Sequence, residues 1–298
     1  MKAIVYDHYG PPDVLHIEDV PKPVPEDDEV LIRVRAAEAT KADTEMRSFR
    51  FAVNWFWLPL RLAFGVRRPK RRILGGYFAG EVVALGKDVT RLAVGDEVYG
   101  TAGIRFGAYG EYVSLPARYT IVPKPTNMSF VEAAAVPLGA LNALHFLRLA
   151  DIQKGEKVLI NGAGGSIGAY GIQIAKAMGA EVTAVDKGIK EDFIRRMGPD
   201  HFVDYTKEDF TAASQTYDVI FDMVPGSSYS GCVRLLNPNG RYLTGNPTIS
   251  FMLRSVFTTW FSDKTVLFRF AGESDEELLA LKAMIEAGKI GSIVEKVY

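Results

Sequence analysis

The sequence predicts a two-domain α/β protein, in which a β-rich first domain precedes a doubly wound parallel sheet. Its length of 298 residues exceeds that of a typical single domain. The first part alternates short apolar segments with proline and glycine turns. From about Thr126 onward, apolar strand patterns alternate with helical patterns, which is typical of a parallel sheet with right-handed crossovers. We therefore expect one domain over residues 1–125 and a second over residues 126–270.

The first domain is expected to form an irregular antiparallel barrel or sandwich. Prolines 21, 23 and 25 and the glycines between positions 75 and 100 separate its apolar segments. The predicted strands are Ala3 to Tyr6, Leu15 to Val20, Val30 to Arg35, Phe78 to Leu85, Glu97 to Tyr99 and Tyr112 to Leu115.

The second domain is expected to alternate strands and helices without an internal repeat. Pro137 divides an Ala- and Leu-rich stretch, Phe130 to Leu149, into two helices, because proline cannot continue a helix from its preceding turn. Two further helices are predicted at Ile167 to Met178 and Lys190 to Met197. The predicted strands are Val158 to Asn161, Val182 to Val185, Phe202 to Asp204, Val219 to Asp222, Arg241 to Thr244 and Thr265 to Phe270.

The composition is that of a globular protein and gives no sign of a nucleic-acid partner. Apolar residues make up 48% and charged residues 24% of the chain. The 35 basic and 36 acidic residues leave a net charge of −1, too small to attract nucleic acid. The single cysteine, Cys232, cannot form an internal disulfide, which fits a reducing compartment and predicts a cytoplasmic location.

No membrane-spanning segment is expected. Trp55 to Val66 is interrupted by Pro59 and Arg61, and Ile249 to Phe261 is interrupted by Arg254. Each stretch is also shorter than the roughly 18 to 20 apolar residues that a spanning helix needs.

A glycine-rich loop follows the predicted strand that ends at Asn161, in the sequence NGAGGSIG. Glycines let the backbone turn sharply and approach a pyrophosphate, whose charge is met by free N–H groups at the start of the next helix. We therefore predict a nicotinamide coenzyme bound by Gly162, Gly164, Gly165, Ser166 and Ile167. A side chain at Gly165 is expected to block the pyrophosphate and to strain the backbone.

The residues after the second strand of this unit bear on the choice of coenzyme. Asp186 lies about 20 residues beyond the glycine loop, where an acid accepts hydrogen bonds from the adenosine ribose of NAD(H). A solvated acid at the end of a strand is the alternative. Lys187 and Lys190 can instead neutralise the 2′-phosphate of NADP(H). We expect either NAD(H) or NADP(H), with a modest preference for NADH.

Several motifs closely resemble the zinc-free, quinone-oxidoreductase-like branch of the medium-chain dehydrogenase/reductase superfamily. They are "ILGGYFAGEVVALGKDVTRLAVGDEVYG" (73 to 100), "GAYGEYV" (107 to 113), "AAAVPLGALNAL" (133 to 144), "VLINGAGGSIGAYGIQIAKAMGAEVTAV" (158 to 185), "DHFVDYTKEDF" (200 to 210) and "VRLLNPNGRYL" (233 to 243). The resemblance implies a GroES-like catalytic domain, a Rossmann coenzyme domain and a substrate cleft between them. It also implies that 271–298 returns to the catalytic domain and that the chain is truncated at its end.

The resemblance also identifies the positions that hold the catalytic zinc in zinc-containing relatives. Thr40, Gly76, Tyr77 and Leu138 occupy them here. These side chains cannot supply the N, S and O ligand set of a catalytic zinc, so we expect no metal.

Without a Lewis acid, an already conjugated acceptor is the more suitable substrate, so the expected reaction is hydride transfer to a quinone or an α,β-unsaturated carbonyl compound. Enoyl-thioester reduction and a non-catalytic nucleotide-binding or scaffold protein are the alternatives. Tyr77 is the expected oxyanion donor, although a packed core tyrosine is equally compatible with the sequence. Thr40 and Asp43 are further candidates in the same cleft, and Asp43 is equally suited to capping a helix.

The resemblance implies coenzyme contacts at four more positions, Asn142, Tyr205, Gly245 and Asn246. For Asn142, an ordinary polar helix residue is the alternative. A homodimer that pairs near Thr265 to Phe270 is a further expectation. For Met46 to Arg72, with Trp55, Phe56 and Trp57 before a basic run, a packed loop is expected, with an apolar lid or a lipid-headgroup contact as alternatives.

Overall fold

The computed structural model describes residues 1–51, 57–269 and 272–298. The chain divides into two compact units. The first comprises Met1–Pro137, Glu273–Glu286 and Val294–Tyr298, and the second comprises Leu138–Gly272 and Ala287–Ile293. The predicted α/β fold with one β-rich and one parallel-sheet unit is confirmed. The bounds 1–125 and 126–270 for independent domains stay a prediction.

The first unit is built on a five-stranded antiparallel sheet with the order β6-β3-β4-β5-β7. A separate antiparallel pair joins β1 to β2. The strands are β1 (Lys2–Val5), β2 (His16–Asp19), β3 (Glu29–Ala37), β4 (Tyr77–Leu85), β5 (Glu97–Thr101), β6 (Tyr112–Pro116) and β7 (Ile121–Pro123). Only β7 was absent from the sequence-based prediction, because three residues are too few to show an alternating pattern.

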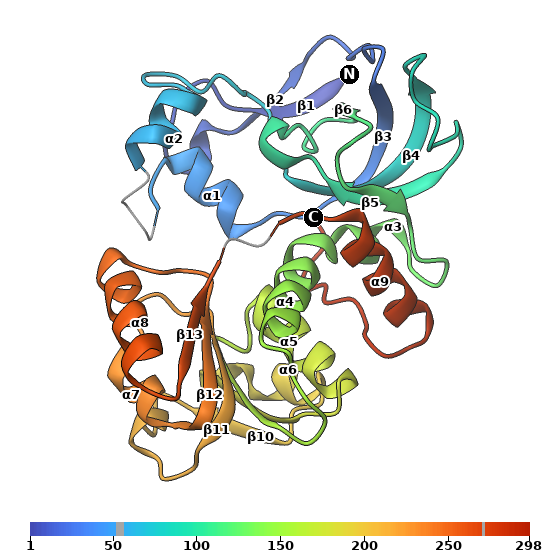
Figure 1. Cartoon of the computed structure of the whole chain (residues 1–298). Helices are drawn as coiled ribbons and strands as arrows, with labels where there is room; N and C mark the ends of the chain where they lie inside the picture. Colours follow the sequence, from blue (N-terminus) through green and yellow to red (C-terminus); the bar gives the residue numbers. More distant parts are fainter. Residues whose placement is uncertain (52–56, 270–271) are drawn as a thin grey trace. The chain divides into compact units, whose positions relative to one another are not determined.

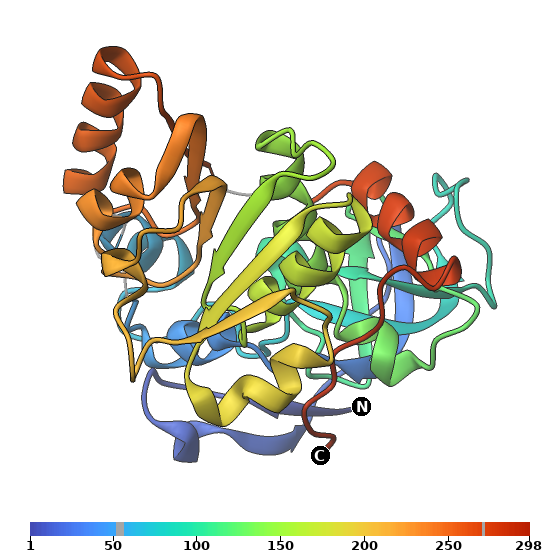
Figure 2. The same ribbon diagram turned by 90° about the horizontal axis from the view of Figure 1, so that it is seen from below.

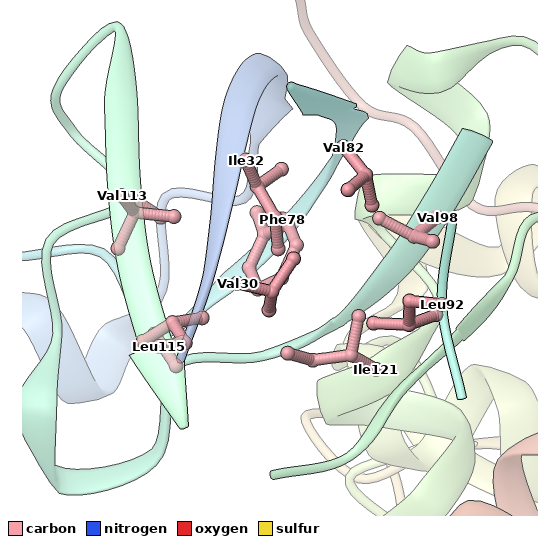
Figure 3. Close-up of a cluster of buried hydrophobic side chains, with 11 residues drawn as sticks. Val30, Ile32, Phe78, Val82, Leu92, Val98, Val113, Leu115 and Ile121 are labelled. Carbon is pink, nitrogen blue, oxygen red and sulfur yellow. The ribbon is translucent and has the colours of Figure 1, made fainter. Parts of the chain in front are cut away.

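One apolar cluster fills the interior of this sheet. Phe78 is fully buried at its centre, and branched aliphatic side chains from all five strands and from Leu92 surround it (Figure 3). Along β6, the buried residues Val113 and Leu115 alternate with the half-buried Tyr112 and Ser114, as the two-residue period of a strand requires.

The described residues of this unit also form α1 (Lys41–Ser48), α2 (Trp57–Phe64), α3 (Phe130–Ala134) and α9 (Asp275–Glu286), with short 3₁₀ turns at Pro12–Val14 and Gly103–Arg105. The last helix, α9, packs against β7 and is coloured red in Figure 1. The Tyr99 hydroxyl donates a hydrogen bond to the Leu278 carbonyl oxygen, 2.9 Å away. The sequence-based prediction did not include α9.

The second unit contains a six-stranded, fully parallel sheet with the order β10-β9-β8-β11-β12-β13. Its strands are β8 (Lys157–Asn161), β9 (Glu181–Asp186), β10 (His201–Asp204), β11 (Tyr217–Asp222), β12 (Leu236–Thr244) and β13 (Thr265–Phe268). The chain first builds outward from β8 to β10 and then outward on the other side from β11 to β13. This is the strand order of the doubly wound dinucleotide-binding fold.

The helices in the described part of the second unit are α4 (Pro137–Leu149), α5 (Ser166–Ala177), α6 (Glu191–Arg195), α7 (Tyr229–Arg234) and α8 (Ile249–Phe261), with 3₁₀ turns at Gly188–Lys190 and Phe210–Ala212. Pro137 is the first residue of α4, so the predicted break before it is confirmed. Helix α5 packs against β8 and β9, whereas α8 packs against the edge strand β13. Figure 2 shows α8 (orange-red) beside the last strands of the sheet.

Three sequence-based expectations need correction or a note. The strand predicted to end at Phe270 ends at Phe268, and Phe270 lies outside the described residues. Trp55 and Phe56 also lie outside them. Trp57 begins α2, so this part of the segment is an eight-residue helix rather than the expected loop, and its Phe64 packs against the apolar cluster that includes Met46 and Leu74. No helix in the described ranges has the length and apolar character needed to cross a membrane.

Truncating Phe78 to alanine is expected to lower the free energy of unfolding by about 3 to 5 kcal/mol, because the fully buried ring leaves a cavity in the centre of the sheet. Ile104→Ala, at a side chain that is 72% exposed, serves as the control and is expected to change it by less than about 0.5 kcal/mol. Urea denaturation followed by circular dichroism measures both. Equal effects of the two substitutions would contradict the assigned core.

Candidate active site

The glycine loop lies where the direction of winding changes in the parallel sheet. Strands β8 and β11 are neighbours, and the chain leaves them toward opposite edges. In such sheets, ligands bind beyond the carboxyl ends of the strands at this point. The loop follows directly after Asn161, and Gly162 adopts φ +82°, a left-handed conformation that favours glycine.

The start of α5 presents backbone N–H groups that no side chain caps. Gly165 is the N-cap residue and supplies no side-chain acceptor. The N–H groups of Ser166, Ile167 and Gly168 lie in the first turn, where no intrahelical acceptor exists. Gly165 is exposed. These residues fit a pyrophosphate, because uncapped N–H groups and the positive end of the helix dipole attract an anion.

The reason for the glycine at 165 differs from the expected one. Its φ of −88° suits any residue, so the predicted backbone strain is wrong. A Cβ at this position would meet only the Gly162 carbonyl oxygen, at 3.4 Å. Gly168 is different, because a Cβ there would lie 2.3 Å from the same oxygen. Gly168 therefore allows close packing of α5 on the loop, whereas Gly165 leaves open space above it.

Asp186, at the end of β9, holds the glycine loop through its carboxylate. One oxygen accepts from the Gly164 N–H at 2.7 Å and the other accepts from the Lys187 N–H at 2.7 Å. The Lys190 ammonium lies 3.5 Å from the carboxylate and donates to the Gly164 carbonyl oxygen at 3.3 Å. The acid is 6% exposed, so it is not the solvated side chain of the alternative interpretation.

A buried polar network connects the carboxyl ends of the two central strands. The Asn161 amide donates to Asp222 Oδ1 at 3.0 Å, and the Tyr242 hydroxyl donates to Asp222 Oδ2 at 2.8 Å. Ser227 Oγ and the Val224 N–H also donate to Asp222 Oδ1, each at 3.0 Å. Burial raises the pKa of Asp222 despite these donors. The network fixes the ends of β8 and β11, and the sequence analysis missed it because it marked these residues only as strand ends.

The four remaining coenzyme candidates all lie in the second unit. The Asn142 amide donates to the Leu138 carbonyl oxygen within its own helix at 2.8 Å, which agrees with an ordinary helix residue as well as with a ligand contact. Tyr205 is 45% exposed just after β10. Gly245 and Asn246 follow β12, and the Asn246 amide donates to the Met223 carbonyl oxygen at 3.2 Å.

In the first unit, Thr40 and Asp43 form a capping box at the start of α1. The Asp43 N–H donates to Thr40 Oγ1 at 3.1 Å, and Asp43 Oδ2 accepts from the Thr40 N–H at 3.0 Å and from its hydroxyl at 2.6 Å. The other carboxylate oxygen accepts from the Gly75 N–H at 3.0 Å. Both side chains thus already serve the backbone, which favours the capping interpretation over a catalytic role.

Tyr77 begins β4 and lies opposite Thr101 of β5 on one side and, on the other, opposite Glu38, the residue that directly follows β3. The Glu38 N–H donates to the Tyr77 carbonyl oxygen at 3.1 Å, and Tyr77 pairs with Thr101 in register. Residues directly opposite one another in antiparallel strands project from the same face. Burial, with Glu273, Glu38 and Asp43 adding negative charge, raises the pKa of the Tyr77 phenol. This hydroxyl therefore keeps its proton.

Glu38 is the residue of this cluster that the sequence analysis missed. Its Oε2 atom is buried and has no hydrogen-bond partner among the described residues. Burial, together with the negative charge of Asp43, raises the pKa of Glu38 to about 8. The pKa of Tyr109, whose hydroxyl approaches the Glu38 carbonyl oxygen at 3.5 Å, is also raised, by burial and by Asp43. The isolated acid in "AAEAT" was the available signal, but only the strand register places it beside Tyr77.

Four positions of this chain correspond to the zinc ligands of zinc-containing relatives. They are occupied by Thr40, whose hydroxyl is part of the capping box, and by Gly76, Tyr77 and Leu138. A Cβ at Gly76 would meet no atom within 4 Å. Within the described residues, the acid and histidine groups spaced to hold a cation are Asp7, His16 and Glu18, and Glu26, Asp28 and Glu29. Neither group includes position 40, 76, 77 or 138.

Comparisons with known proteins agree with this geometry. Residues 26–126 match the model for the alcohol dehydrogenase GroES-like domain, and residues 197–298 match the model described as zinc-binding dehydrogenase. The chain is 31% identical to a 2-methylene-furan-3-one reductase of Solanum lycopersicum, over 99% of this chain and 71% of the relative. It is also 31% identical to a chloroplastic NADPH-dependent alkenal/one oxidoreductase of Arabidopsis thaliana, over 99% and 72%.

Among solved structures, the quinone oxidoreductase of Coxiella burnetii superimposes with a TM-score of 0.84 at 30% identity, over 97% of this chain and 88% of that one. The chain belongs to the quinone-oxidoreductase-like branch of the medium-chain dehydrogenase/reductase superfamily. It is an oxidoreductase, and its parallel-sheet unit is the nicotinamide coenzyme unit of that superfamily.

Replacing Gly165 with valine is expected to abolish coenzyme binding by this oxidoreductase while leaving the fold intact. The side chain meets little protein but fills the space above the uncapped N–H groups. Titration with NADH and NADPH, followed by coenzyme fluorescence, measures the loss. We expect at least about a hundredfold weaker binding, since the pyrophosphate loses several charge-assisted hydrogen bonds.

Gly168→Ala is the comparison variant, because its Cβ collides with the loop backbone rather than with a ligand. We expect it to lower the thermal midpoint as well as the affinity. Binding of either coenzyme to Gly165→Val with the affinity of the unmodified protein would place the pyrophosphate elsewhere.

Proposed function

We propose that the protein transfers hydride from a nicotinamide coenzyme to a quinone or an α,β-unsaturated carbonyl compound, and that Tyr77 and Glu38 act on the acceptor. The names of the relatives from S. lycopersicum, A. thaliana and C. burnetii support this class of acceptor. The observation that carries the proposal is the placement of Glu38 opposite Tyr77, which brings a buried carboxyl oxygen without a hydrogen-bond partner among the described residues close to a phenol. Burial raises the pKa of both groups, so both keep a proton near neutral pH and can act as donors.

The bound coenzyme supplies a hydride, which adds to the β-carbon of an enone. The π electrons of the carbon–carbon double bond then move toward the carbonyl oxygen. Tyr77 donates a hydrogen bond to that oxygen and stabilises its negative charge without giving up the proton. This task suits a phenol whose pKa is raised.

Glu38 completes the reduction of an enone by protonating the α-carbon of the enolate. Since its pKa is raised to about 8, the carboxyl group is protonated at neutral pH and releases a proton more readily than Tyr77 does. The enolate electrons form the new C–H bond, the carbonyl is restored, and water returns a proton to the carboxylate. A quinone differs, because its reduced oxygens take their protons directly from water.

Glu38→Gln is therefore expected to lower kcat for methyl vinyl ketone by about 10² to 10⁴, the usual contribution of a positioned acid. Reduction of 1,4-benzoquinone should change less than about threefold, because that product needs no carbon protonation. Wild-type enone reduction should fall as the pH rises through about 8, where Glu38 loses its proton, and this decline should be absent from the variant. Stopped-flow oxidation of NADH and NADPH measures all of these rates.

Two further variants complete the test. Tyr77→Phe should slow both acceptors by about 10² to 10³, the usual effect of losing an oxyanion donor. Glu81→Gln, in the same strand and paired with Arg35, is the control and should leave both rates unchanged. Equal losses for both acceptors in Glu38→Gln would remove Glu38 from the mechanism but leave the hydride transfer in place. Turnover only with crotonyl-CoA would favour the enoyl-thioester alternative, and no turnover would favour a binding protein.

For the coenzyme, we propose that Asp186 and Lys190 together set a modest preference for NADH. Asp186 repels a 2′-phosphate, whereas Lys190, 44% exposed at its side chain, can pair with one. The relative from A. thaliana is named as NADPH-dependent, so the balance between these two residues decides the outcome. We also propose that a second copy of the chain pairs with the sheet edge at β13, and that the protein acts in the cytoplasm.

Lys190→Ala is expected to weaken NADPH binding by about tenfold, since a charge-assisted hydrogen bond to phosphate contributes roughly 1.5 kcal/mol, and to leave NADH binding nearly unchanged. Asp186→Ser should weaken both coenzymes, because the Gly164 N–H loses its acceptor, and should shift the ratio toward NADPH. Isothermal titration of both coenzymes into each variant gives the ratios. If neither substitution changes the ratio of the dissociation constants for NADH and NADPH, Asp186 and Lys190 do not face the ribose.

A further inference from the structure

The segment around α2 combines exposed apolar side chains with a high density of positive charge. Between Met46 and Gly80 the sequence contains eight arginine and lysine residues and no aspartate or glutamate, although the whole chain has a net charge of −1. Helix α2 has no buried residue. The segment therefore differs from the surrounding surface both in charge and in apolar character.

The apolar side chains of this segment form one stripe. Leu58, Leu62 and Val66 follow one another at four-residue spacing, which places the two leucines on one face of the helix and Val66 just beyond its end. They are 60%, 59% and 57% exposed. Solitary exposed leucines are common on protein surfaces, but a continuous stripe on a helix without buried residues indicates a contact surface.

Contacts from the side chains of Tyr9 and Arg61 hold α2 against the first unit, while the stripe of Leu58, Leu62 and Val66 faces solvent. The Tyr9 hydroxyl donates to the carbonyl oxygens of Phe64 and Gly65, at 3.1 and 2.9 Å. The Arg61 guanidinium lies over the rings of Tyr9 and Phe49, 4.1 and 4.5 Å from their centroids. Tyr9 and Arg61 therefore hold α2 to the first unit, while Leu58, Leu62 and Val66 stay exposed.

The cations that follow the helix are mostly available. Arg67, Arg68 and Arg71 are exposed, and none of them pairs with an acid within the described ranges. Lys70 donates to the Leu62 carbonyl oxygen at 3.1 Å, which ties the basic run back onto the helix. Arg72 is the exception, since it forms ion pairs with Asp7 and Glu18.

We propose that this surface, made of Leu58, Leu62, Val66, Arg67, Arg68 and Arg71, docks the protein on an anionic lipid membrane. Leucine and valine enter the boundary between headgroups and acyl chains, while the arginines meet lipid phosphates and carboxylates. Helix α2 has eight residues and lies in the interface rather than crossing it.

Charge decides against a second copy of the chain as the occupant. In a two-fold symmetric dimer through this face, the arginines of one copy would lie against the same arginines of the other, and like charges repel. Helix α8 provides a useful contrast, because its exposed residues Phe257 and Trp260 are accompanied by a single cation, Arg254, which lies over Tyr229.

Sedimentation of the full chain with vesicles tests the proposal. The vesicles are pure phosphatidylcholine or phosphatidylcholine with about one third phosphatidylserine. We expect binding to the anionic vesicles only, and release when the salt is raised from about 0.05 M to 0.5 M, where charges are screened within a few ångströms. No sedimentation with anionic vesicles at low salt, or equal sedimentation with both kinds, overturns the proposal.

The variants separate charge from apolar contact. Each cation near an anionic surface strengthens binding by about fivefold, so Arg67→Ser with Arg68→Ser and Arg71→Ser should weaken it by about a hundredfold. The control is a triple variant elsewhere on the surface, Lys22→Ser with Arg33→Ser and Arg118→Ser, which changes the net charge by the same amount. It should weaken membrane binding by less than about fivefold. Leu58→Glu with Leu62→Glu should abolish binding, whereas Val24→Glu with Ile104→Glu, also at exposed positions, should not.

Circular dichroism of every variant confirms that loss of binding is not loss of folding. A second double variant, Phe257→Glu with Trp260→Glu, tests α8. If it loses membrane binding while the double variant at Leu58 and Leu62 keeps it, the membrane contact lies on α8 and the proposal is overturned. Sedimentation equilibrium shows whether the protein is a dimer. A dimer that dissociates in the double variant Leu58→Glu, Leu62→Glu would show that α2 contacts a second copy of the chain, which also overturns the proposal.

Discussion

The buried carboxylate of Asp43 fixes the backbone around Tyr77 and Glu38. Its three hydrogen bonds join the start of α1 to the turn at Gly75, two residues before β4. The same charge contributes to the raised pKa of Glu38 and of Tyr77. A residue whose hydrogen bonds have a structural role thus also influences the proton affinity of both proposed catalytic groups.

The glycine loop depends on backbone conformation and on one buried carboxylate that holds it. Gly162 supplies a left-handed turn, Gly168 allows α5 to approach the loop, and Gly165 leaves the first turn of that helix open. Asp186 orients the loop through the Gly164 N–H, so the residue expected to select the coenzyme also shapes its binding site. A substitution at Asp186 therefore changes affinity and selectivity together.

The sequence predicted what depends on local pattern and missed what depends on register. The strand, glycine loop and helix from Lys157 to Ala177 were predictable because a short buried apolar run, turn glycines and a helical pattern agree there. Thr40 and Asp43 were identified as candidates, and their spacing already allowed for the capping box. Glu38 was missed because its role depends on its position opposite Tyr77, which is set by pairing across strands more than thirty residues apart. Helix α9 was missed since its apolar face has a partner only in the assembled unit.

The three separate segments of the first unit have a consequence for synthesis on the ribosome. Tyr99 is fully buried in the finished protein, but the carbonyl that accepts its hydroxyl hydrogen lies 179 residues later in the chain. At typical rates of translation, roughly 10 to 40 s pass between the two. During that interval the nascent sheet lacks the helix that packs against β7, and every strand and helix of the parallel sheet is synthesised before that helix. The segment translated first is thus among the last to reach its final packing, and nascent-chain chaperones have their greatest opportunity to act on the amino-terminal half.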